Sequence, residues 1–222
     1  MMLVMSQTLE ADRLFAPNRE VALRQYRSRA SIYDLELLLA EPIRHLTISR
    51  LALRRGDTVI DVGCGTGLSF ERIEVLIGRR GLIVGIEQSA EMLEKARERV
   101  ARHHWHNITL INSSVEDALI PPACDAALFH FTHDVMRTPR AIENVANALK
   151  PYGRVAAAGL KWAPLWAMPV NAAVLFAAIR SVTALEGLSA PWDHLRRFTS
   201  DLKIEDLLGG GVYVASGRIK PR

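Results

Sequence analysis

The run Val59-Ile60-Asp61-Val62-Gly63-Cys64-Gly65-Thr66-Gly67 joins a short β-branched strand, which ends in an acid, to a G-x-G-x-G turn. Residues 68–77 follow with the pattern of a helix. Glycine has no Cβ, so it adopts positive φ freely and lets a ligand approach the backbone closely. A glycine turn between a strand and a helix N-terminus is where α/β folds bind nucleotide-like ligands. The run therefore predicts an α/β fold with such a ligand at this turn.

Strand and helix patterns alternate through the middle of the chain. Strands are expected at 58–62, 82–87, 107–112, 125–129 and 154–159, and helices at 19–32, 35–51, 89–103 and 139–149. This alternation predicts right-handed crossovers and a parallel sheet. At the C-terminal end, strand-like residues 202–208 and 212–219 flank three glycines, Gly209 to Gly211, which predicts a closing antiparallel hairpin.

The glycine spacing distinguishes between kinds of nucleotide-binding site. Dinucleotide enzymes show G-x-G-x-x-G, and a P-loop ends in Gly-Lys-Ser/Thr, and neither pattern is present. Instead, D-x-G-x-G-x-G resembles motif I of the class I S-adenosylmethionine (SAM)-dependent methyltransferases. The run Lys150-Pro151-Tyr152-Gly153-Arg154 is similar to the LKPGGR turn of that family, with tyrosine in place of the first glycine. The resemblance covers roughly residues 30–160, and it implies a Rossmann-like, seven-stranded, mostly parallel sheet with helices on both faces.

The same resemblance implies the residues that hold SAM. The glycine turn and Asp61 would contact its methionine part, and Glu87, which ends the second strand, would accept hydrogen bonds from the ribose hydroxyls. After the third strand the acid that this family often carries is replaced by Ser114. The full set of expected cofactor contacts is Asp61, Gly63, Cys64, Gly65, Gly67, Glu87, Gln88, Met92, Ser114, Val115 and His130.

The catalytic candidates follow the fourth strand, because the carboxyl ends of parallel strands line the ligand crevice. They are His130, His133 and Asp134, joined by Tyr33 from the N-terminal region, where Tyr33-Asp34 resembles a pair found in small-molecule and lipid methyltransferases. A base is needed only where the acceptor must lose a proton. For His130, packing on SAM or bonding to its carboxylate is the main alternative to a role as general base. No set of residues indicates a metal.

Composition limits the partners. The chain has 222 residues, a net charge of +4 and a pI near 9.3. Its arginines are scattered rather than gathered into a basic run with aromatics, so nucleic-acid binding is not expected. Two isolated cysteines and a short apolar N-terminus suggest a cytoplasmic protein. We expect no transmembrane segment; a weak contact with anionic membrane surfaces and a homodimer both stay open.

The chain is expected to form a single domain, 1–222. It would comprise an N-terminal helical lid (1–50), a SAM-binding core (51–160), an apolar acceptor-side insert (161–200) and the closing hairpin (201–222). The insert is rich in large apolar side chains, Trp166 and Phe176 among them, which suits a small apolar or amphiphilic acceptor of N- or O-methylation. We place Trp166 at the acceptor pocket and Phe176 in the core. The alternatives are a nicotinamide-dependent oxidoreductase and a non-catalytic SAM-binding partner subunit.

Overall fold

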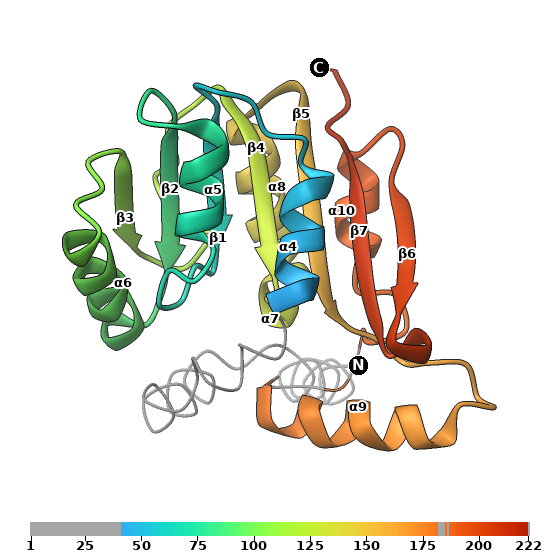
Figure 1. Cartoon of the computed structure of the whole chain (residues 1–222). Helices are drawn as coiled ribbons and strands as arrows, with labels where there is room; N and C mark the ends of the chain where they lie inside the picture. The colour runs from blue at the N-terminus through green and yellow to red at the C-terminus, as the bar shows by residue number, and fades with distance from the viewer. Residues whose placement is uncertain (1–40, 182–184, 186, 222) are drawn as a thin grey trace, which may run out of the picture.

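The computed structural model describes residues 41–181, 185 and 187–221 (Figure 1). A single sheet runs through them in the strand order β3-β2-β1-β4-β5-β7-β6. Its strands are β1 (Thr58–Val62), β2 (Leu82–Glu87), β3 (Ile108–Asn112), β4 (Cys124–His130), β5 (Leu149–Leu160), β6 (Lys203–Leu207) and β7 (Val212–Arg218). Strands β1 to β5 pair in parallel, and β7 pairs antiparallel with both β5 and β6. The predicted seven-stranded Rossmann-like sheet with a closing antiparallel hairpin is confirmed.

Helices cover both faces of this sheet (Figure 1). Their bounds are α4 (Glu41–Arg50), α5 (Phe70–Ile77), α6 (Ala90–Arg102), α7 (His133–Met136), α8 (Pro139–Ala148), α9 (Met168–Ser181) and α10 (Asp193–Phe198), with a short 3₁₀ turn, η1 (Leu208–Gly210), between β6 and β7. Ser89 caps α6 by accepting a hydrogen bond from the Met92 amide. Pro139 opens α8, where a missing amide hydrogen costs nothing.

Side chains alternate between the two faces along each strand, as the pleat of a sheet requires. Val59, Ala126 and Leu128 belong to the core cluster beneath α4, α5 and α6. Ile60 and Phe129 belong to the cluster beneath α8 and α10. The next inward positions after Val59 and Leu128 are Asp61 and His130, so this alternation places both polar side chains on the face that α4 covers.

Helix α4 buries a stripe at helical spacing. Thr47 and Ile48 on α4, and Leu51 just after it, are fully buried, and Arg44, one turn earlier, is only 2% exposed. Positions 44, 47, 48 and 51 fall on one face of a helix. The packing of α4 on the sheet therefore carries a guanidinium group to the carboxyl end of the strands.

The segment between β5 and β6 contains α9 and α10. In Figure 1, α9 lies beyond the carboxyl ends of the central strands rather than against the sheet. Trp166 is 81% exposed and Phe176 is 62% exposed, so the prediction of a core position for Phe176 is wrong. No helix among the described residues is long and apolar enough to cross a membrane. The predicted lid up to residue 40, Tyr33 included, lies outside the described residues.

Candidate functional site

The glycine turn follows β1 and needs glycine for its backbone. Gly63, Gly65 and Gly67 all have positive φ, at 64°, 56° and 79°. A Cβ added at Gly63 would clash with Thr132, and one at Gly67 would clash with Phe70. A Cβ at Gly65 would meet nothing within 4 Å, so this glycine borders open space rather than protein. Gly65 is thus the point of the turn at which another molecule can touch the backbone.

Glu87 ties the end of β2 to this turn. Its Oε2 accepts a hydrogen bond from the Gly65 amide (3.1 Å), and its Oε1 accepts one from the Ser89 amide (2.8 Å). Burial raises the pKa of Glu87, although these backbone N–H groups act in the opposite direction. A carboxylate offers about four acceptor positions, and the backbone amides of Ser89, Gly65 and Gln88 leave room for a further donor such as a hydroxyl. The geometry suits an acid that reads a ribose.

A small polar recess opens under the turn, where β1 and β4 end and the strand order reverses. We define it by its lining residues, which are Arg44, Asp61, Gly63, Cys64, Gly65, Thr66, Leu68, Ser69 and His130. Its volume of about 30 Å³ admits a small polar group rather than a whole nucleoside. Ligands of open α/β sheets bind at such a reversal point.

Opposite charges face each other in this recess. Asp61 is buried, and its Oδ2 has no hydrogen-bond partner among the described residues. Burial raises the pKa of Asp61 to about 7, although the nearby guanidinium of Arg44 acts to lower this pKa. Arg44 also pairs with Glu41, one turn earlier on α4. Buried polar atoms are nearly always satisfied, so an orphaned carboxylate oxygen beside an arginine points to a missing polar partner.

His130 contributes two more orphaned atoms. Both of its ring nitrogens are shielded from solvent and have no hydrogen-bond partner in the described part of the chain. Burial, assisted by the charge of Arg44, lowers the pKa of His130 to about 3. The imidazole is therefore neutral at physiological pH and is a weak proton acceptor. It fits a positioning role better than that of a general base.

Of four other predicted site residues, one lines the recess and three do not. Cys64 lines it, and burial raises the pKa of this thiol, which suits packing rather than nucleophilic chemistry. His133 begins the short helix α7 just after β4. Ser114 is buried and donates a hydrogen bond to Asp117. Met92, on α6, is buried as well.

Sequence reasoning missed two residues of the site. Arg44 lies on a helix before the glycine turn and belongs to no motif, although its place in the buried stripe of α4 marks it as an unusual core position. Thr132 packs its methyl group against Gly63, and its hydroxyl has no partner among the described residues.

Comparison with known proteins agrees with this geometry. The family described as "Methyltransferase domain" matches residues 59–153, which run from β1 to the start of β5. This segment is less than half of the chain, and its match supports the predicted resemblance to the class I SAM-dependent methyltransferases. The family's cofactor is SAM. The match includes the glycine turn, Glu87, Ser114 and His130.

Individual relatives are more distant. Protein-L-isoaspartate O-methyltransferase of Ignicoccus hospitalis is 33% identical over 90 residues, 40% of this chain and 42% of that protein. 2-phytyl-1,4-naphtoquinone methyltransferase of Trichormus variabilis is 28% identical over 116 residues, about half of each chain (51% and 51%). The chain thus spans about half or less of the length of these relatives.

A solved structure shows the same fold. An O-methyltransferase family protein from Burkholderia thailandensis superposes with a TM-score of 0.69 over 87% of this chain and 60% of that chain, at 16% identity. At this identity the likeness concerns the fold alone.

The residues present fit SAM. The open space at Gly65, the amide bonds to Glu87 and the orphaned atoms of Asp61 and His130 are the features that a bound nucleoside with an amino-acid tail would complete.

Proposed function

We propose that this protein binds SAM with its methionine end in the polar recess and transfers the methyl group to a small acceptor. The observation that carries the proposal is the burial of Arg44 and Asp61 in one recess beside the glycine turn. An amino acid is a zwitterion, so it needs a cation for its carboxylate and an anion for its ammonium group. The recess offers one of each.

Arg44 and Asp61 would bind different groups of the methionine end. The Arg44 guanidinium would donate to the carboxylate, because its planar fork matches a carboxylate closely. Asp61 would accept from the ammonium group, which supplies the partner that its Oδ2 lacks. Glu87 would accept from the ribose hydroxyls, and Gly65 would let the cofactor lie against the backbone. The adenine would lie near Gln88, Met92, Ser114 and Val115.

When bound, SAM supplies a methyl group already activated by its sulfonium. The residues of this chain then contribute position rather than bond-breaking chemistry, because an in-line transfer depends mainly on alignment. The neutral His130 would hold the methionine end or the acceptor by a hydrogen bond. Where the acceptor must lose a proton, His133 and Asp134, just beyond β4, are the described candidates for the base.

We propose a small apolar or amphiphilic acceptor, methylated on nitrogen or oxygen. The support is the apolar surface of the segment between β5 and β6, where Trp166 and Phe176 are largely exposed. Helix α9 of this segment lies beyond the carboxyl ends of the central strands (Figure 1). The naphtoquinone methyltransferase relative is named for an acceptor of this kind. We place the protein in the cytoplasm, since Cys64 and Cys124 are both free and buried.

The test compares two ligands on paired variants. S-adenosylhomocysteine carries the amino-acid tail, and 5′-methylthioadenosine lacks it. Arg44→Met should weaken S-adenosylhomocysteine by tenfold or more, since a hydrogen bond to a charged group is worth about 1.5–3 kcal/mol. It should leave 5′-methylthioadenosine unchanged. Calorimetric titration of both ligands separates a direct contact from a folding defect, because a folding defect would weaken both.

A second pair tests the turn. Gly65→Ala places a methyl group in the open space beside the recess. Gly56→Ala is the matched control, because Gly56 also has positive φ and open space around its missing Cβ but lies in the turn before β1. Both variants bear similar backbone strain, and only Gly65→Ala should lose S-adenosylhomocysteine binding. Equal binding by the two variants would refute the placement of SAM at this turn.

A further inference from the structure

A second and larger pocket lies at the opposite end of the central strands, where β1 and β4 begin. We call it the basic pocket, and its lining residues include Arg54, Lys150, Tyr152, Arg154 and Arg218, together with Asp57 and Asp125. Its volume is about 230 Å³, against about 30 Å³ for the polar recess. The polar recess lies at the carboxyl ends of β1 and β4, so the two pockets are separated by the length of these strands.

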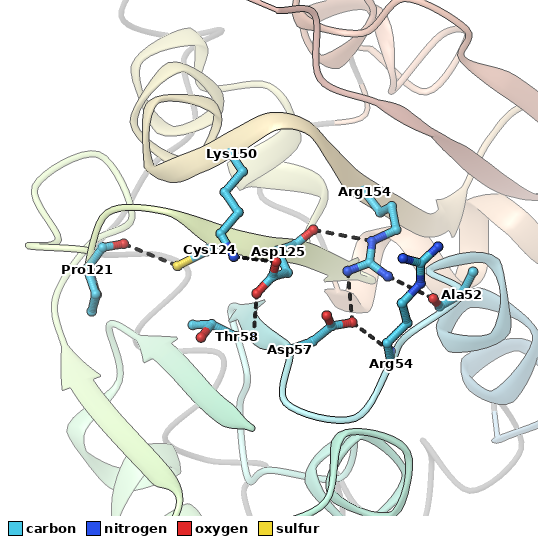
Figure 2. A network of polar contacts seen from close by, with 9 residues as sticks. All are labelled: Ala52, Arg54, Asp57, Thr58, Pro121, Cys124, Asp125, Lys150 and Arg154. Carbon is cyan, nitrogen blue, oxygen red and sulfur yellow. Dashed lines mark hydrogen bonds and ion pairs between the residues drawn. The ribbon is translucent and has the colours of Figure 1, made fainter. Parts of the chain in front are cut away.

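Each of the two acids of the basic pocket already has a cation and a backbone amide as partners (Figure 2). Asp57 pairs with Arg154 (2.8 Å) and accepts a hydrogen bond from the Arg54 amide (2.6 Å). Asp125 pairs with Lys150 (2.6 Å) and accepts a hydrogen bond from the Thr58 amide (2.9 Å). Arg154 also donates to the Ala52 carbonyl oxygen (2.7 Å). These bonds fix the floor of the pocket and neutralise two of its cations.

Two arginines of the pocket remain without a counter-ion. The guanidinium groups of Arg54 and Arg218 form no ion pair with any described residue, although the backbone amide of each is hydrogen-bonded. Four basic and two acidic side chains line the pocket, which leaves an excess of two positive charges. A concave surface with such an excess attracts anions, and guanidinium groups bind phosphate oxygens in pairs.

Tyr152 gives the pocket an aromatic wall. Its ring is 58% exposed and makes no ring contact with another described residue. Its φ of 61° lies in the left-handed region, which side chains with a Cβ adopt at a cost. Glycine would adopt this conformation freely, so the tyrosine is not explained by the turn. A strained residue that keeps an exposed ring beside unpaired cations suggests a ligand with a planar group.

We propose that the basic pocket binds a small phosphate-bearing ligand of the nucleoside phosphate class, with the phosphates between Arg54 and Arg218 and the planar base on Tyr152. The pocket's 230 Å³ is below the usual range for a whole drug-sized ligand. It suits one or two phosphates, with the rest of the ligand lying outward over the exposed tyrosine. This site is independent of the proposed SAM site.

The experiment titrates the full-length protein with pyrophosphate and with ADP by calorimetry at about 50 mM salt, where charge pairing is weakly screened. The wild type should bind both ligands saturably. Arg54→Gln combined with Arg218→Gln should weaken both by about tenfold or more, through the loss of two charged donors. The control replaces Arg72 on α5 and Arg102 on α6 by glutamine. It removes the same charge from exposed positions elsewhere and should change neither affinity.

Tyr152→Gly separates the ring from the cations. It should weaken ADP and leave pyrophosphate unchanged, while the melting temperature holds or rises because glycine relieves the positive φ. S-adenosylhomocysteine affinity should be the same in all of these variants, which also shows that each is folded. The proposal is wrong if wild-type protein fails to bind pyrophosphate, or if the control pair weakens it as much as the pocket pair does. Equal loss of ADP and pyrophosphate in Tyr152→Gly would remove the nucleoside part of the proposal.

Discussion

Asp61→Asn should stabilise the ligand-free protein at alkaline pH while it weakens SAM binding. Asparagine is close to aspartate in shape but carries no charge. Burial raises the pKa of Asp61 from an ordinary value of 3.8 to about 7. The folded state therefore holds this proton more tightly than the unfolded chain does. Its stability must fall as pH rises between these two values, because the carboxylate is then ionised in a buried place.

The size of the effect follows from the two pKa values. Between about pH 5 and about pH 8, Asp61 is protonated in the folded state but ionised in the unfolded chain over roughly two pH units. Each unit is worth about 1.36 kcal/mol. The wild type should thus lose about 2.5 kcal/mol of unfolding free energy through this group over that range. The Asp61→Asn variant has no such loss, because its amide does not titrate. The stability difference between variant and wild type should grow in favour of the variant by the same amount.

The assay is urea unfolding of ligand-free protein, followed by tryptophan fluorescence across this pH range. Asp125→Asn is the control, because Asp125 is partly buried but its pKa lies below the ordinary value, with Lys150 and the Thr58 amide lowering it against the opposing effect of burial. Asp125 stays ionised from pH 5 upward in both states, so its variant should be destabilised equally at both ends of the range. Parallel profiles for Asp61→Asn and wild type would refute the reasoning.

Three further predictions concern binding and the acceptor surface. SAM affinity of the wild type should rise about tenfold from pH 6 to pH 8 as Asp61 ionises, and titration of Asp61→Asn should show no such rise. Glu87→Ala should weaken SAM by at least tenfold in a titration, since each lost bond to a charged acceptor is worth about 1.5–3 kcal/mol, and Glu87→Asp should be milder; equal binding by Glu87→Ala and wild type would place the ribose elsewhere. Trp166→Ala and Phe176→Ala should change methyl-transfer rates across a panel of apolar amines and phenols, yet lower the melting temperature by little, because both side chains are exposed. A large drop would show that they are covered in solution.

The sequence was informative where backbone rules decide the structure. The bounds of β1 and β2 were predicted to the residue, because each is a short run rich in β-branched residues that begins just after a glycine turn. The start of β5 was predicted at residue 154, whereas the strand begins at Leu149. Local propensity marks Pro151 and Gly153 as a turn, but the Tyr152 amide bonds to Ile219 and the Gly153 carbonyl oxygen accepts from the Ile219 amide. Tertiary pairing outweighed local preference there.

Phe176 was misplaced for a different reason. An apolar run does not say which surface covers it, and α9 lies beyond the strand ends instead of packing on the sheet (Figure 1), with Phe176 62% exposed. The helical periodicity of 3.6 residues could not predict the exposure of Phe176, because α9 is apolar on most sides and so has no single inward face. What the sequence did report correctly was the concentration of large apolar side chains after β5.

Arg44 shows what motif reading leaves out of a site. Motif I fixes a backbone shape and one acid, and both lie within a few residues of one another in the chain. The cation that completes the recess comes from a helix before the motif, and only the packing of α4 on β4, β5 and β7 brings it there. Position 44 shares a face with Thr47, Ile48 and Leu51, which are fully buried. A long charged side chain in such a stripe costs desolvation unless a partner offsets it. Glu41 offsets part by pairing with Arg44, and the orphaned oxygen of Asp61 shows that the rest of the site is still incomplete. A charged residue at a core position of an otherwise apolar stripe is therefore a signal that sequence reading can use even where no motif is present.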